Sequence, residues 1–411
     1  MDLKQHQNEN YMRPLSKITE GLIGQPMFRL LANTQAKERR GERIYHFEIG
    51  DSDLPVHPHI TQAVKKALDN GRTHYVDSTG IIEFKRAISD DVEKRLEFKP
   101  SHGQILVMPS NAVIDFVVRC VADPGDEVIY PDPGFSTYRS VIKYTGVKGV
   151  GIPLHEKNGF HLKPIDIERR ITDKTKLIIV NSPSNPTGAV LNEDEILEIS
   201  LIAKKYNLYI LSDEVYSKVV FDSRQHHSLG ISDQCREHTI ILEGFSKVYS
   251  MAGFRLGYAI GPEHVIEKMG LLFQTIFSCF PAFIQYGGIS ALTEHEDLTR
   301  QRIKTYEGLR DIIYEKINSI PNISCLRPEG ALYVFPNITR TRMTSQQFCE
   351  FALERANIAL LPGTCFGDYG EGHIRICYAR KETMIVEAMD KLKRALQDTR
   401  IERLKLAHER I

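Results

Sequence analysis

The chain has 411 residues, of which 42% are hydrophobic and 26% are charged. A single hydrophobic core stops growing near about 250 to 300 residues, so this length predicts two domains. The 53 basic residues equal the 53 acidic residues, and like charges do not form long blocks. This balance disfavours nucleic acid and anionic membranes as partners, because the chain has no net positive charge to attract a polyanion.

The cysteines and the N-terminal segment bear on the compartment. The seven cysteines are odd in number and include no CxxC pair, which disfavours a disulfide framework and a zinc site. We therefore expect a reducing, cytoplasmic setting and no metal. The first ten residues, MDLKQHQNEN, lack the apolar segment of a signal peptide, and polar residues and a proline interrupt the longest apolar stretch, residues 271–283. We expect no membrane-spanning segment.

Short apolar segments alternate with amphipathic segments of helical length between about residues 104 and 260. This alternation is typical of a mostly parallel sheet that is covered by helices on both faces. In such α/β folds, ligands bind at the carboxyl ends of the strands. The predicted strands are residues 105–108, 127–131, 177–181, 208–214, 239–244 and 257–261, and the predicted helices include residues 111–123 and 193–206.

The pattern changes after about residue 290. A long charged helical segment, a strand pair around PEGALYVF (328–335) and two further helices predict a smaller α+β domain. The Pro-rich stretch SDLPVHP (52–58) is suited to a linker. We therefore expect a large domain of residues 59–289, and a small domain built from residues 1–58 and 290–411.

Two turn motifs follow predicted strands. In PSNAV (109–113), Ser110, Asn111 and Ala112 open a predicted helix, whose free N–H groups and positive dipole end suit a phosphate. An ordinary N-cap is the alternative. In NSPSNPTG (181–188), two prolines and a glycine predict a fixed turn that would aim Asn185 at a ligand, and a plain loop is the alternative.

A carboxylate and two cations follow the next strands. Asp213, in SDEVY with Tyr216, ends an apolar strand and would need a cationic partner if buried; a structural ion pair is the alternative. Lys247 lies in the glycine-rich stretch GFSKVYSMAGFRLG (244–257), where burial and nearby positive charge would make its amine nucleophilic. A lysine whose amine merely reaches solvent is the alternative. Arg255, in the same stretch, has the planar fork that binds phosphate.

Together these motifs describe one cofactor, pyridoxal 5'-phosphate. It has an aldehyde for a lysine, a ring nitrogen for a carboxylate, a phenolic oxygen for hydrogen bonds and a phosphate for a helix N-terminus. The chain resembles the class I and II aminotransferases, of fold type I of the pyridoxal-phosphate enzymes. GFSKVYSMAGFRLG is similar to the family's lysine signature, NSPSNPTG and SDEVY are similar to two further blocks, and the likeness runs from about Phe47 to Arg380. It implies a mostly parallel seven-stranded sheet between helices and a smaller α+β domain.

The resemblance also implies roles for individual residues around the cofactor. Lys247 would form the Schiff base and move the substrate proton, and Asp213 would pair with the ring nitrogen. Asn185 and Tyr216 would bind the phenolic oxygen, and Phe135, in PDPGFSTY, would stack on the ring. The phosphate would be held by Ser110, Asn111, Ala112, Ser246 and Arg255, with Tyr75, in THYVDSTG, reaching the phosphate of the neighbouring subunit of a homodimer.

For the substrate, the resemblance implies that Arg375 grips the α-carboxylate, with Gly50 and Asn185 close by. A structural salt bridge is the alternative for Arg375. Some aspartate-using relatives carry a lysine in the phosphate loop, where Ser110 stands here. The aromatic residues Phe277, Phe280 and Phe283 fall where relatives contact the substrate across the dimer, so they would favour an apolar substrate unless they are core.

The predicted function is therefore that of an aminotransferase with a ping-pong cycle. An L-amino acid would leave its amino group on the enzyme, and a 2-oxo acid would take it away. A pyridoxal-phosphate β-lyase or decarboxylase is the alternative within the fold. A ligand-sensing module of a regulator is a further alternative, although the N-terminal segment has no basic helix-turn-helix. The amino acid, the oxo acid and the pathway stay open.

Overall fold

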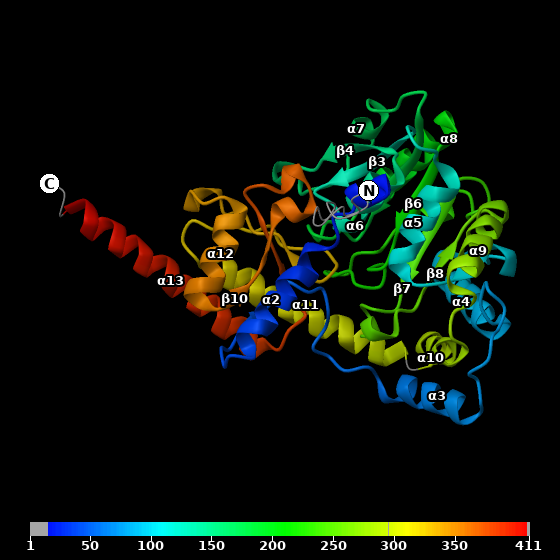
Figure 1. The fold of residues 1–411 in the computed structure, drawn as a ribbon, viewed down its shortest axis with the longest axis horizontal. Coiled ribbons are helices and arrows are strands. Elements are labelled where there is room, and N and C mark those ends of the chain that lie inside the picture. The colour runs from blue at the N-terminus through cyan, green and yellow to red at the C-terminus, as the bar shows by residue number, and fades with distance from the viewer. Residues whose placement is uncertain (1–14, 295, 409–411) are drawn as a thin grey trace, which may run out of the picture.

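A computed structural model describes residues 15–294 and 296–408 of the chain. Its centre is a seven-stranded sheet with the strand order β2-β8-β7-β6-β5-β3-β4. Strand β8 runs antiparallel to both of its neighbours and the other pairs are parallel, which confirms the predicted mostly parallel sheet (Figure 1). The strands are β2 (Ile105–Val107), β3 (Glu127–Asp132), β4 (Lys148–Pro153), β5 (Thr175–Asn181), β6 (Tyr209–Asp213), β7 (Thr239–Gly244) and β8 (Gly257–Ile260).

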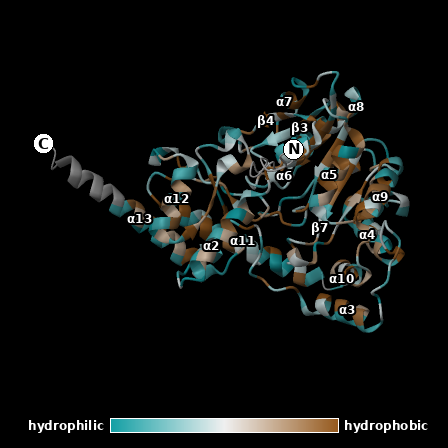
Figure 2. Ribbon diagram, viewed as in Figure 1, coloured by the Kyte–Doolittle hydropathy of each residue, from teal (hydrophilic) through white to brown (hydrophobic). Residues whose placement is uncertain are grey.

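Strand β5 explains why helices cover both faces of the sheet. Successive side chains of a strand point to opposite faces, and every residue from Leu177 to Val180 is apolar and buried. Leu177 and Ile179 pack in the core that contains α5 and α9, whereas Ile178 and Val180 pack in the core that contains α8. Figure 2 shows hydrophobic segments in brown beside α5 and α9. The helices of this part are α3 (Pro58–Asp69), α4 (Ile82–Leu96), α5 (Ser110–Val121), α6 (Ser136–Thr145), α7 (Pro164–Glu168), α8 (Glu193–Tyr206), α9 (Glu263–Phe277) and α10 (Ala282–Thr293).

Strand β4 is the strand of this sheet that the sequence pattern did not indicate. Its sequence KGVGIP contains two glycines and a lysine, and only Ile152 is fully buried. The strand lies at the edge of the sheet and pairs with β3 over six residues. Pairing with a neighbour, and not an apolar run of its own, therefore determines this element.

A second region joins the two ends of the chain. Strand β1 (Tyr45–His46) pairs in parallel with β10 (Ile358–Ala359). Strands β11 (Leu361–Pro362), β12 (Ile374–Cys377) and β9 (Tyr333–Val334) form an antiparallel sheet. The domain boundaries at 58 and 289 stay predictions, although the β1–β10 pairing joins the segments assigned to the small domain. The helices of this second region are α1 (Lys17–Glu20), α2 (Pro26–Glu38), α11 (Glu296–Asn318), α12 (Ser345–Ala356) and α13 (Glu382–His408).

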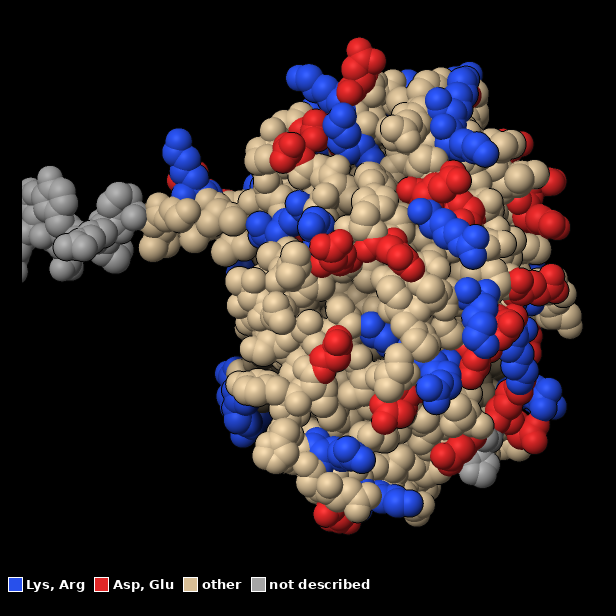
Figure 3. Space-filling model, turned by 90° about the vertical axis from the view of Figure 1, so that its right-hand side faces the viewer, with Lys and Arg blue, Asp and Glu red and all other residues tan. Residues whose placement is uncertain are grey.

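The charged side chains on the surface are mixed in sign, as the balanced composition predicts. Lys and Arg side chains alternate with Asp and Glu side chains over the face in Figure 3. Within residues 15–294 and 296–408, no helix combines the length and the apolar character that crossing a bilayer requires. The last helix, α13, extends away from the body of the molecule (Figure 1).

Candidate active site

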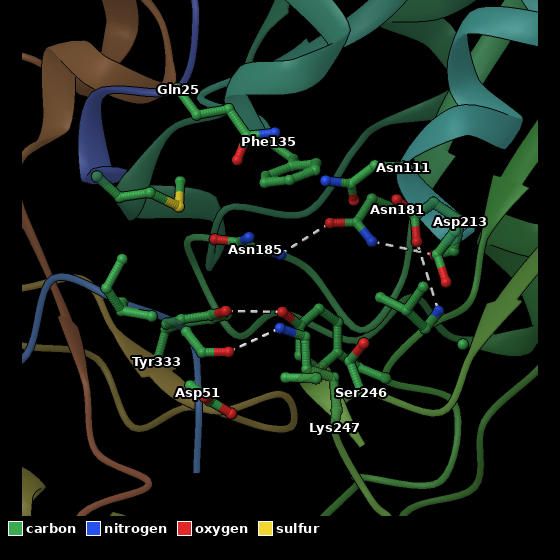
Figure 4. Close-up of a pocket in the computed structure, with 18 of the residues that line it drawn as sticks. Gln25, Asp51, Asn111, Phe135, Asn181, Asn185, Asp213, Ser246, Lys247 and Tyr333 are labelled. Atoms are coloured by element: carbon green, nitrogen blue, oxygen red, sulfur yellow. Dashed lines mark hydrogen bonds between the residues drawn. The ribbon is translucent and has the colours of Figure 1, made fainter. Parts of the chain in front are cut away.

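A cavity of about 320 Å³ lies where strands β5, β6 and β7 end. This is the edge of the sheet at which ligands bind in folds of this kind. Figure 4 shows side chains from distant parts of the sequence facing one another there. The predicted residues that line the cavity are Gly50, Ser110, Asn111, Phe135, Asn185, Asp213, Tyr216, Ser246, Lys247, Arg255 and Arg375.

Lys247 lies in the turn after β7, and its amine belongs to the cavity wall. Nζ donates a hydrogen bond to the Gly50 carbonyl over 2.7 Å and lies 5.7 Å from the centroid of the Tyr216 ring (Figure 4). The side chain is half-buried. These contacts disagree with the alternative in which the amine merely reaches solvent.

Asp213 ends strand β6 and is 3% exposed. Its carboxylate accepts hydrogen bonds from the Tyr138 hydroxyl at 2.6 Å and from the Val215 N–H at 3.4 Å. Burial raises the pKa of the Asp213 carboxyl to about 6, although the Tyr138 hydrogen bond acts in the opposite direction. No cation of the described chain forms an ion pair with it. The geometry therefore does not support a structural ion pair, and a buried carboxylate of this kind requires a proton or a cation from the cavity.

Asn185 and Asp213 are joined through Asn181. The Asn181 side chain accepts from the Asn185 N–H at 2.8 Å and donates to the Asp213 carbonyl at 3.0 Å (Figure 4). In the sheet, Asn181 is the register partner of Asp213. This link fixes the loop 181–188, as its prolines and glycine predict.

Helix α5 begins at Ser110, with Pro109 at its N-cap position and no side-chain cap. The reading of Ser110 as an ordinary N-cap is therefore wrong, since the Ser110 hydroxyl donates instead to the Glu243 carbonyl at 3.3 Å. The Ala112 N–H donates to the Pro109 carbonyl at 2.9 Å. Ala112 faces an adjoining groove and does not line the main cavity.

Two glycines let the start of α5 approach the sheet. A Cβ atom at Gly257 would lie 2.2 Å from the Ser110 hydroxyl oxygen, and a Cβ atom at Gly244 would lie 2.5 Å from it. Arg255 precedes Gly257 by two residues and lines the cavity together with Ser110 and Asn111 at the start of α5. Arg255 is exposed and donates to the Ala252 carbonyl at 2.8 Å. This end of the cavity has the chemistry of an anion site.

Arg375, on β12, is 1% exposed and has no ion-pair partner within residues 15–294 and 296–408. Its guanidinium carbon lies 4.5 Å from the Tyr333 ring centroid and 4.8 Å from the Phe366 ring centroid. It donates to the Asn185 side chain at 3.3 Å and to the Glu48 carbonyl. Its Nε has no hydrogen-bond partner in the described part of the chain. The structural salt bridge considered for Arg375 is thus not observed, and a buried guanidinium without an anion suits an incoming carboxylate.

Some predicted residues lie outside the cavity of this chain. Tyr75 follows α3 and is 87% exposed. Phe280 is 2% exposed, Phe277 is 50% exposed, and Phe283 is half-buried. None of the three phenylalanines lines the described cavity. Phe280 is therefore a core residue, whereas Phe277 belongs to the surface.

The cavity also contains residues that sequence reasoning missed. Asn181 opens the quoted motif NSPSNPTG at a strand end, so its position was a usable signal. Tyr333 lies in the apolar stretch PEGALYVF, and no local pattern separates it from a core tyrosine. The missed lining residues from the start of α2 are Gln25, Met27 and Phe28.

Comparisons with known proteins show which family the chain belongs to. The sequence profile of the aminotransferases of class I and II matches residues 43–392. The chain belongs to this family. An aspartate aminotransferase of Pyrococcus horikoshii is 35% identical over 359 residues, which are 87% of this chain and 91% of that protein. The aromatic-amino-acid aminotransferase 2 of Thermococcus litoralis is 34% identical over 364 residues, covering 88% and 93%.

Among solved structures, the aromatic aminotransferase of P. horikoshii superposes with a TM-score of 0.85 at 32% identity. The match covers 89% of this chain and 99% of that structure. The chain is accordingly a transferase that moves amino groups, as the sequence predicts. Members of the family generally depend on pyridoxal phosphate and act on amino acids and 2-oxo acids.

Proposed function

We propose that this cavity holds pyridoxal 5'-phosphate on Lys247 and that the enzyme transfers the amino group of an L-amino acid to a 2-oxo acid in a ping-pong cycle. One observation carries the proposal. The Lys247 amine and the Asp213 carboxylate, which has no cationic partner in the described chain, face the same cavity. An aldehyde and a protonated ring nitrogen on one molecule would satisfy both groups.

The residues at hand fit this cofactor. Asp213 is buried without a cation, Phe135 offers a ring to stack on, and the first turn of α5 with Arg255 offers an anion site. When bound, pyridoxal phosphate supplies an aldehyde carbon and a ring that accepts electrons from the substrate. Asp213 would hold the proton of the ring nitrogen. The residues proposed to hold the phenolic oxygen and the phosphate are Asn185, Tyr216, Ser110, Asn111, Ser246 and Arg255, all of which line the cavity, whereas Ala112 does not.

The substrate would lie between Lys247 and Arg375. Arg375 would bind the α-carboxylate, with Asn185 and the backbone of Gly50 beside it. This contact would orient the substrate so that Lys247 Nζ takes the proton from Cα. The Gly50 carbonyl, which accepts from Nζ in this structure, would hold the amine in position.

The cavity wall supports a substrate with an uncharged side chain. Within the described chain, the cations that line the cavity are Lys247, Arg255 and Arg375, and each has a proposed partner. The start of α2 adds Met27 and Phe28, which are apolar. A distal carboxylate would therefore be desolvated without a cation. We expect a higher kcat/KM for phenylalanine or leucine than for aspartate, and the reverse order would contradict this preference.

We further propose a homodimer with shared active sites in a reducing, cytoplasmic setting. Tyr75 supports the dimer, because its ring is 87% exposed and outside the cavity of its own chain. Reaching the phosphate in a neighbouring subunit would give it a contact. All seven cysteines are free, which supports the proposed reducing setting because disulfides persist in oxidising compartments.

Absorbance spectroscopy tests the proposal. Addition of pyridoxal phosphate is expected to produce a visible band, which an L-amino acid bleaches and a 2-oxo acid restores. Lys247→Ala is expected to lose both the band and turnover. Lys148→Ala is the matched control, because Lys148 is exposed and pairs with Glu127 at 2.8 Å. Release of ammonia or carbon dioxide without an oxo acid would contradict transfer and indicate a lyase or decarboxylase.

A further inference from the structure

Tyr333 contacts both the cofactor side and the substrate side of the proposed site. It lies on β9 and is 1% exposed. Its hydroxyl oxygen is 2.7 Å from the Tyr216 hydroxyl oxygen, a contact that Figure 4 marks with a dashed line at Tyr333. Its ring centroid lies 4.5 Å from the Arg375 guanidinium carbon. We propose that Tyr333 is a positioning residue, which orients the Tyr216 hydroxyl through its own hydroxyl and the Arg375 guanidinium through its ring. The inference rests on the proposed function.

The Tyr333 hydroxyl has little freedom to move. A Cβ atom at Gly50 would lie 2.0 Å from the hydroxyl oxygen, so the residue at this position must be glycine for the tyrosine to fit. The Gly50 carbonyl in turn accepts the hydrogen bond from Lys247. Tyr333 is therefore packed against the backbone that holds the reactive amine.

A count of protons gives the direction of the bond between the two tyrosines. Each hydroxyl has a single proton. If the Tyr216 hydroxyl donates a hydrogen bond to the phenolic oxygen of the cofactor, Tyr333 must donate the hydrogen bond between the two hydroxyl groups. A donated hydrogen bond polarises Tyr216 and strengthens it as a donor. Tyr333 would thus stabilise the anionic form of the phenolic oxygen without touching it.

The Tyr333 ring acts on Arg375. The pairing of β9 with β12 sets Tyr333 opposite Cys377, two residues from Arg375. The guanidinium carbon lies 4.5 Å from the Tyr333 ring centroid and 4.8 Å from the Phe366 ring centroid. Aromatic faces attract a desolvated cation. Since no described carboxylate pairs with Arg375, the two rings hold the guanidinium in place for an incoming carboxylate.

Two substitutions separate the hydroxyl from the ring, and both are measured on the loaded enzyme. Tyr333→Phe is expected to raise the pH midpoint of the visible band by about half to one pH unit, the effect of one lost hydrogen bond. Its affinity for 3-phenylpropionate, a carboxylate without an amino group, is expected to stay within about twofold of that of the unmodified enzyme. Tyr333→Leu is expected to raise the pH midpoint of the visible band as well, and to weaken the binding of 3-phenylpropionate about tenfold.

Tyr378→Phe is the matched control, because Tyr378 is also fully buried and donates to the Ala331 carbonyl at 2.8 Å. This substitution is expected to change neither the pH midpoint of the visible band nor the affinity for 3-phenylpropionate. In the Tyr216→Phe background, Tyr333→Phe should shift the midpoint no further. An unchanged midpoint in Tyr333→Phe alongside a shifted one in Tyr216→Phe would overturn the inference and leave the proposed function standing. An equal shift in Tyr378→Phe would also overturn it. Absence of any visible band in the unmodified enzyme would instead overturn the proposed function.

Discussion

The buried arginines of this chain differ in what they contact. Arg310 is fully buried and pairs with Asp222 at 2.6 Å, and Arg380 is 9% exposed and pairs with Asp53 at 3.0 Å. Arg375 is as deeply buried but contacts one backbone carbonyl oxygen, a side-chain amide and two rings. Breaking a buried pair is strongly destabilising, so the first two arginines are structural. The environment of Arg375, which lines the cavity without an ion pair in the described chain, supports its proposed role in substrate binding.

Substitution of Arg375 tests its role directly. Arg375→Lys keeps the charge but loses the planar fork and the contacts of the guanidinium with two rings. We expect KM for the amino acid to rise about 10- to 100-fold, which corresponds to charged hydrogen bonds of about 1.5 to 3 kcal/mol. Steady-state kinetics measures this change. Arg340→Lys, at an exposed position, is the control, and an unchanged KM in Arg375→Lys would contradict the assignment.

The raised pKa of Asp213 predicts an unusual pH dependence of stability in the cofactor-free protein. The native carboxyl keeps its proton up to about pH 6, whereas the unfolded chain loses it near the ordinary pKa of 3.8. Between these values the native state binds more protons, so the free energy of unfolding falls as the pH rises. With about 1.4 kcal/mol per pKa unit, the total decrease is on the order of 3 kcal/mol.

Asp213→Asn lacks this titration. We expect its cofactor-free form to exceed the unmodified protein in free energy of unfolding above pH 6, with the difference disappearing below about pH 4. Urea unfolding between pH 4 and 7 measures it. Asp297→Asn, at an exposed carboxyl, should follow the unmodified protein throughout. Parallel pH profiles for Asp213→Asn and the unmodified protein would contradict the account.

At the scale of the elements, the contact between α5 and strands β7 and β8 forms the proposed phosphate site. It depends on Gly244 and Gly257, because a Cβ atom at either position would collide with the Ser110 hydroxyl. At Gly257 the same atom would also lie 2.7 Å from the Glu243 carbonyl oxygen. The helix N-terminus can approach the strand ends only because both residues are glycine.

Gly257→Ala should therefore displace the start of α5. Overpacking of this kind typically costs about 1 to 3 kcal/mol of stability, and we expect weaker binding of pyridoxal phosphate as well. Thermal unfolding and a cofactor titration measure the two effects. Gly308→Ala, in α11, has open space around its Cβ position and should be neutral or stabilising. Unchanged cofactor affinity in Gly257→Ala would count against the proposed phosphate site.

The elements also show where sequence reasoning succeeds. Strands β5 and β7 are continuous apolar runs, and the residues that follow them, Asn185 and Lys247, could be placed at one edge of the sheet. Strand β4 has no such run, and strand β9 covers only two residues. The position of Tyr333 depends on its pairing with β12, which is about 40 residues away in the sequence and follows from tertiary contacts. Local patterns therefore predicted the cavity residues that follow β5 and β7 better than the cavity residue Tyr333 on β9.

At the scale of the whole molecule, the exposed apolar side chains Ile276 and Phe277 lie at the end of α9, and Tyr75 follows α3. Ile276 is 63% exposed, and Tyr75 is 87% exposed. Burial of such surface is a main driving force of association. This surface supports the proposed homodimer, in which Tyr75 serves the neighbouring cavity.

Mixing two impaired variants tests whether the sites are shared. In a mixed dimer of Tyr75→Leu with Lys247→Ala, one site would combine an intact Lys247 from the first chain with an intact Tyr75 from the second. We expect subunit exchange to restore tight cofactor binding and turnover at that site. Sedimentation and activity measurements would follow the exchange. If the activity of the mixture stays at the sum of the activities of the two variants measured separately, Tyr75 does not serve the neighbouring subunit.

The central claim is that the Lys247 amine is the group that binds the cofactor aldehyde. Borohydride reduction of the loaded enzyme makes a bond between an amine and an aldehyde permanent, and peptide mass spectrometry then locates it. We expect the cofactor mass on the peptide that contains Lys247. The same mass on the peptide of another lysine, or on none, would contradict the account.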